Sequence, residues 1–168
     1  VPLNNSSNII IDKNRFEIAK LVISKFENNL DFNEELNILQ NLNKKNKNHI
    51  FEKINIIKSQ NYRGVFYLKN IFSQELNEFL KANINIRSNN IMTRSLMRFI
   101  VIEPSQKNII KNNDINFLNK VKFFLNQKKY KTSYQSIKNI KDHEKYFSET
   151  INQLKIAIEF EQLIKEVS

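Results

Sequence analysis

The stretch NYRGVFYLKNIFSQELNEFL, residues 61–80, decides the fold class, because it pairs the only glycine of the chain, Gly64, with an unbroken helical pattern. Glycine takes a positive φ at little cost, and tight two-residue hairpins depend on it. After the turn at residues 61–64, apolar side chains recur every three or four residues, as on one face of an α-helix: Phe66, Leu68, Phe72, Leu76, Phe79 and Leu80. A chain with one glycine cannot form many hairpins, so the sequence predicts an all-α fold without a sheet.

The same apolar spacing continues outward from this stretch over most of the chain, and polar breaks at residues 43–48 and 83–90 interrupt it. Asn and Ser, rather than Gly and Pro, must therefore supply the turns and caps. We predict an irregular multi-helix bundle of two packed helical parts. Its divisions are a tail or linker at residues 1–11, a first part at 12–83 and a second part at 89–168.

The most apolar helical stretch lies at residues 91–102 and ends at Glu103 and Pro104. A helix of this kind is expected to be buried on most of its surface. We therefore expect it to form the core of the second part, with Met97 and Phe99 as core residues.

The chain has 168 residues, a formal charge of +10 and 28 asparagines, but only five arginines. Asn, Lys and Ile are the residues of A+T-rich codons, so an A+T-rich genome accounts for much of this composition. A coat of lysines contacts phosphates without reading bases, so any nucleic-acid binding is predicted to be weak, non-specific and sensitive to salt. No apolar run approaches the roughly 18 residues of a membrane span, and no membrane association is expected.

Residues for catalysis, metal binding or cofactor binding are not evident. The chain lacks cysteine, which excludes disulfides and thiolate metal sites. His49 and His143 have no partners at metal-ligand spacing, and one glycine is too few for a phosphate-binding loop. The paired carboxylates Glu34-Glu35 and Glu159/Glu161 lie among lysines and are interpreted as solvated charge. We expect no catalytic residue, no metal, no cofactor and no small-molecule ligand in this segment.

The final helix carries more apolar surface than a short terminal helix usually buries alone. With no following segment to cover its last two turns, this face is predicted to bind a helical partner protein. The predicted partner-binding residues are Leu154, Ile158, Phe160, Leu163 and Ile164.

Five segments share their order and apolar pattern with a known family: Ile57 to Leu76, which contains Phe66 to Lys69, then Thr93 to Ile100, Glu103 to Ser105, Phe117 to Asn126, and Phe147 to Leu154. From about Ala19 to Val167 the chain resembles the region of a bacterial DnaG-type DNA primase that follows the polymerase core and ends in the helicase-binding domain. The resemblance implies a parent protein that makes RNA primers, and a cytoplasmic segment that docks on the replicative helicase. The family usually continues beyond the position of Ser168 into a second helical arm, which implies a shortened or altered helicase contact here.

Two other interpretations stay open. A secreted or surface interaction module of a host-dependent microbe would have the same Asn- and Lys-rich helical sequence, and a nucleic-acid-binding bundle is a third alternative. Residues preceding Val1 would separate the first two, because zinc ligands and an acidic metal-binding core indicate a primase, whereas a signal peptide or lipobox indicates a surface protein.

Overall fold

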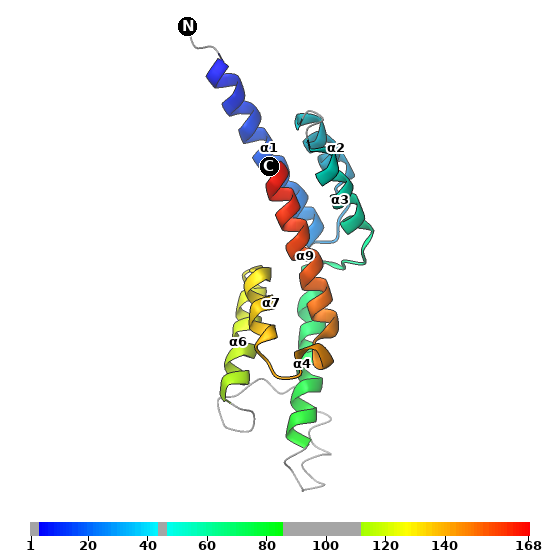
Figure 1. The fold of residues 1–168 in the computed structure, drawn as a ribbon, viewed down its shortest axis with the longest axis vertical. Helices are drawn as coiled ribbons and strands as arrows, with labels where there is room; N and C mark the ends of the chain where they lie inside the picture. Colours follow the sequence, from blue (N-terminus) through cyan, green and yellow to red (C-terminus); the bar gives the residue numbers. More distant parts are fainter. Residues whose placement is uncertain (1–3, 44–46, 86–111) are drawn as a thin grey trace. The chain divides into compact units, whose positions relative to one another are not determined.

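The structure, a computed structural model, describes residues 4–43, 47–85 and 112–168, and these ranges contain eight helices and no strand (Figure 1). The helices are α1 (Asn4–Glu27), α2 (Asn33–Leu42), α3 (Asn48–Ser59), α4 (Gly64–Asn85), α6 (Asn112–Asn126), α7 (Tyr130–Lys138), α8 (His143–Tyr146) and α9 (Ser148–Val167). The predicted all-α fold is confirmed. The predicted core residues Met97 and Phe99, with the stretch 91–102 around them, lie outside the described residues.

Helix α1 begins at Asn4 and therefore includes residues 4–11 of the segment interpreted from its sequence as a tail or linker. The physical reason is that no glycine or proline lies between residues 3 and 15, so nothing in the backbone stops the helix. None of the described helices combines the length and the apolar character that a membrane crossing requires.

The chain divides into two compact units, residues 1–66 with 156–168, and residues 67–155. This division differs from the predicted parts at 12–83 and 89–168. Helices α4 and α9 each continue from one unit into the other, so the polar breaks that end helices are not the places where the units separate.

The first unit has a core of aromatic and aliphatic side chains from several helices, with α1 packed against α2. The Phe26 ring of α1 stacks on Tyr62 and on Phe160, with centroid distances of 4.2 and 3.7 Å. Its buried aliphatic residues include Val22, Leu36, Leu39, Ile50, Ile54, Ile57 and Ile164. Burial of these side chains holds the unit together through the hydrophobic effect.

The second unit contains the hairpin of α6 packed against α7, and a contact between α4 and the start of α9. The centroid of the Phe147 ring lies 5.8 Å from that of Phe72 and 5.7 Å from that of Phe79. Glu75 of α4 accepts hydrogen bonds from the backbone N–H groups of Glu149 at 3.0 Å and Thr150 at 3.1 Å. Glu75 therefore satisfies two of the donors that the first turn of an α-helix leaves unpaired.

Candidate functional site

The five residues predicted to form a partner-binding face on α9 are not a free surface. Leu154, Phe160, Leu163 and Ile164 are buried, and Ile158 is half-buried. The prediction that this apolar face is available to a partner is therefore wrong for four of its five side chains.

Residues from earlier in the sequence cover the end of α9. The Phe26 ring lies parallel to Phe160, and the Phe32 ring meets Phe160 edge-on with centroids 5.4 Å apart. Asn43 Nδ2 donates to the Val167 carbonyl oxygen at 2.8 Å, and Lys47 Nζ donates to the Glu166 carbonyl oxygen. The cover of α9 therefore comes from α1, from Asn43 after α2 and from Lys47 before α3, all of which precede α9 in the sequence.

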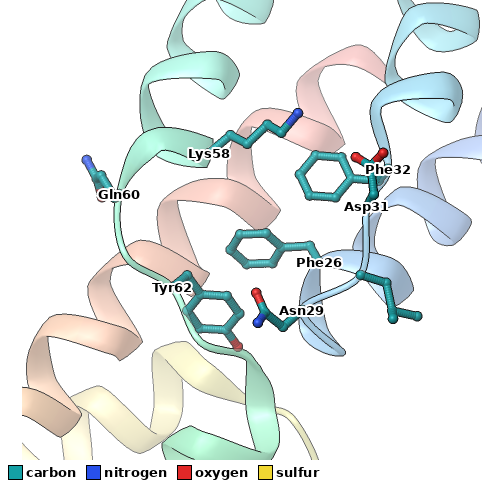
Figure 2. A pocket seen from close by; sticks show the side chains of 8 residues that line it. Phe26, Asn29, Asp31, Phe32, Lys58, Gln60 and Tyr62 are labelled. Atoms are coloured by element: carbon teal, nitrogen blue, oxygen red, sulfur yellow. The ribbon is translucent and has the colours of Figure 1, made fainter.

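A cavity of about 230 Å³ opens in the first unit, beside the same aromatic rings (Figure 2). Its walls come from the α1–α2 connection, the last turn of α3 and the α3–α4 connection. The lining residues are Phe26, Asn29, Leu30, Asp31, Phe32, Lys58, Gln60 and Tyr62. We refer to these eight residues as the aromatic pocket.

The floor of the aromatic pocket is a fixed stack of rings. Phe26 and Tyr62 are nearly parallel, with an interplanar angle of 7°, and Phe32 meets Phe26 edge-on at 76° (Figure 2). All three side chains are buried. Stacked and edge-on contacts between aromatic rings are favourable, so the three rings of the floor stabilise one another.

The turn after α1 places the rim residues. Asn29 has a φ of 54°, in the left-handed region that asparagine tolerates better than most residues. The Leu30 N–H donates to the Lys25 carbonyl at 2.8 Å and closes the end of α1. Asp31 Oδ1 then accepts hydrogen bonds from the backbone N–H and the side-chain amide of Asn33, which fixes it beside the start of α2.

Gly64 lies against this turn. Its φ is +86°, and a Cβ built there would lie 3.0 Å from the Glu27 carbonyl oxygen and 3.2 Å from Asn29 Cβ. The position needs glycine for both reasons, the backbone conformation and the close approach. The only glycine of the chain thus supports the wall of the aromatic pocket.

The rim carries a negative charge on Asp31, a positive charge on Lys58 and the exposed apolar side chain of Leu30. The hydrogen bond from the Asn33 N–H lowers the pKa of Asp31, and Lys58 lowers the pKa further, so Asp31 is ionised at neutral pH. Lys58 Nζ donates to Asn33 Oδ1 and lies 5.3 Å from the Phe32 ring centroid. Leu30 is 57% exposed. The pocket can therefore receive a group with an apolar body and a polar or charged end.

Sequence reasoning missed this pocket, although a signal was present. The run Asn28-Asn29-Leu30-Asp31-Phe32 places two apolar residues inside a turn, where a purely solvated loop would have polar ones. His49 is exposed, and His143 Nδ1 lies 3.0 Å from the Ile140 carbonyl oxygen. Across residues 4–43, 47–85 and 112–168, no three His, Asp or Glu side chains are grouped so that they could hold a metal ion.

Comparisons with known proteins found no relative of this chain. The chain matches no family model, no curated protein and no solved structure.

Proposed function

We propose that this chain is a non-catalytic helical region that binds a protein partner through the aromatic pocket. The observation that carries the proposal is the pairing of a floor of packed aromatic rings with the exposed Leu30 at its rim. Deep pockets that receive an anchoring side chain are where protein interfaces concentrate their binding energy.

The size of the pocket favours a side chain over a cofactor. Sites for small molecules and cofactors usually enclose about 300 to 1,000 Å³, whereas this cavity measures about 230 Å³. The apolar floor suits an aliphatic or aromatic side chain, and Asp31 and Lys58 at the rim suit polar groups of the partner backbone or of neighbouring side chains.

From the resemblance to DnaG-type primases, we propose that the partner is the replicative helicase. The chain would then be part of a cytoplasmic DNA primase. Docking through helical surfaces agrees with the all-α fold. The contact is assigned to the aromatic pocket because Leu154, Phe160, Leu163 and Ile164 are buried within this chain. Ile158, which is half-buried, is the residue of the predicted face that a partner could still touch.

The test is a titration of the chain with the replicative helicase of the same organism, followed by calorimetry. Leu30→Asp places a second carboxylate at the rim, and we expect it to weaken binding by about thirtyfold, the effect of losing one anchor contact. Ile56→Asp is the matched control, because Ile56 is 61% exposed on α3 and does not line the pocket.

Equal affinities of the Leu30→Asp and Ile56→Asp variants for the helicase would show that the aromatic pocket is not the binding site. No binding by the intact chain would discard the primase assignment. Truncation near Thr150 is a poor test, because it also removes Phe160 from the stack on Phe26.

A further inference from the structure

The positive charge of the chain is concentrated in one of its two units. Residues 67–155 contain 16 Lys and Arg against seven Asp and Glu, whereas residues 1–66 with 156–168 contain 11 against 10. Within the second unit, residues 112–141 hold seven lysines and one acidic residue, Asp114. Codon bias acts on the whole chain and does not explain such a difference, so the lysines are not the diffuse coat that composition alone indicates.

The α6–α7 hairpin directs these lysines outward. Leu118, Val121 and Leu125 of α6 are buried, as is Ile137 of α7, and the two helices pack together. On α6 the exposed residues Asn116, Lys120 and Phe123 follow a spacing of four and three, which places them on one face.

Helix α7 has a matching outer stripe. Lys131, Gln135 and Lys138 are exposed and follow the same spacing of four and three. The connection between the helices adds Lys128 and Lys129, which are exposed as well. The hairpin therefore presents ammonium groups on both helices and at the turn between them.

Aromatic rings lie among these cations. Phe123 is 57% exposed, one helical turn from Lys120, and its ring meets Phe124 edge-on with centroids 5.4 Å apart. On α7, Lys138 Nζ lies 5.7 Å from the centroid of the half-buried Tyr134 ring. Exposure of a phenyl ring to water is unfavourable, so a partner that covers the ring gains free energy. Because the ring lies among lysines, the partner that fits is an anion with flat apolar faces.

We infer that the α6–α7 hairpin binds single-stranded nucleic acid, with Lys120, Lys131 and Lys138 contacting phosphates and Phe123 stacking on a base. Cationic grooves combined with exposed aromatic rings are how proteins hold single strands without sequence preference. This surface goes beyond the proposed protein contact, because it lies in the second unit and shares no residue with the aromatic pocket.

The hairpin residues favour this partner over other polyanions. A helix that inserts into a membrane surface buries a continuous apolar face, whereas Phe123 is the one large apolar side chain exposed on the part of the hairpin whose side chains are described. A duplex offers no unpaired base for Phe123. The hairpin contains no arginine, the residue that most often reads guanine, so binding without sequence preference is expected.

The experiment measures fluorescence anisotropy of a fluorescein-labelled 20-mer of thymidylate, titrated with the full chain between 50 and 200 mM salt. The test variant replaces Lys120, Lys131 and Lys138 with glutamine. A second test variant is Phe123→Ala. Circular dichroism checks that both remain folded, as expected for changes at exposed positions.

Each variant has a control of equal chemistry in the first unit. The charge control replaces Lys13, Lys20 and Lys53, all exposed, with glutamine. The ring control is Phe66→Ala, because Phe66 is 77% exposed. Both controls change net charge or exposed apolar area as the test variants do, but leave the hairpin intact.

We expect the hairpin triple variant to reduce the slope of log affinity against log salt by about 2, since each phosphate contact on a single strand contributes about 0.7. We expect Phe123→Ala to weaken binding at least about fivefold, the loss of one stacked base. The lysine control and Phe66→Ala should leave slope and affinity near those of the unmodified chain.

Four results would overturn the inference. These are no binding at 50 mM salt, equal losses in the two lysine variants, equal losses in the two phenylalanine variants, and equal affinity for a duplex of the same length. Displacement of the oligonucleotide by polyglutamate at the same charge concentration would show that the hairpin binds polyanions in general and would also refute it.

Discussion

The Phe160 ring of α9 lies parallel to the Phe26 ring of α1, with 3.7 Å between centroids and 9° between ring planes. On its other side Phe26 stacks on Tyr62, which lines the aromatic pocket. The end of α9 therefore packs directly against Phe26 and Phe32, two of the three rings in the floor of the pocket. A change at position 160 should reach the pocket although Phe160 does not line it.

Phe160→Ala should lower the free energy of unfolding by about 3 to 5 kcal/mol, as expected when a buried phenylalanine is truncated and a cavity remains. Urea unfolding followed by circular dichroism measures the change. The control is Phe66→Ala, which removes an exposed ring and should change the free energy by less than about 0.5 kcal/mol. Similar values for both variants would show that the ring stack contributes little.

Gly64→Ala should destabilise the first unit by about 1 to 3 kcal/mol, because alanine is strained at a φ of +86° and its Cβ approaches the Glu27 carbonyl oxygen. Thermal unfolding is a sufficient measurement. Asn55→Ala, at an exposed position of α3, serves as the comparison. A Gly64→Ala protein as stable as the unmodified chain would contradict the left-handed turn at this position.

Glu75 gives the stability a defined pH dependence. Burial raises the pKa of Glu75 above its usual value of 4.5, although the bonds from Glu149 and Thr150 act in the opposite direction. The unfolded chain thus releases this proton at a lower pH than the folded chain. The contribution of Glu75 is fully present below the unfolded pKa and is lost as the pH rises through the folded pKa.

Glu75→Gln removes that titration and keeps one acceptor oxygen. The stability of the unmodified chain relative to Glu75→Gln should therefore be greater at pH 4 than at pH 7, measured by urea unfolding at both values. Glu78→Gln, at an exposed site on the same helix, should show no such difference. A reversed order at the two pH values would mean that the two N–H bonds outweigh burial.

Asn43→Ala should cost about 1 to 3 kcal/mol, because it removes the donor to the Leu39 and Val167 carbonyl oxygens inside a buried site. Asn41→Ala provides the reference, since Asn41 is exposed on the same helix. The measurement is the midpoint of chemical denaturation. Asn43→Ala should have a lower midpoint than Asn41→Ala if the bond to Val167 stabilises the fold, and equal midpoints would show that it does not.

Local patterns in the sequence predicted that the chain is helical and where several of its helices begin or end. The polar run after Leu42 ends α2, and α3 begins at Asn48, as the spacing of apolar residues indicates. These features depend on residues within one or two turns of each other, which is the range that periodicity and capping describe.

The candidate site could not be predicted in the same way. The burial of Phe160 depends on Phe26, more than a hundred residues earlier, and no local pattern encodes that pairing. The rim of the pocket depends on Asn29 in a left-handed conformation, which asparagine tolerates without requiring it. The separation of charge between the units became visible only once the unit boundaries were known.

The discontinuous first unit has a consequence for synthesis on the ribosome. Its residues 1–66 emerge before residues 67–155, and its remaining segment, 156–168, emerges last. At 5 to 20 residues per second, translating the intervening segment of about 90 residues takes roughly 5 to 20 s. During that interval Phe26 and Phe32 lack the Phe160 ring that later covers them. The nascent chain must therefore carry an incomplete apolar core that a holdase chaperone could bind, while the complete sequence of the second unit has already been made.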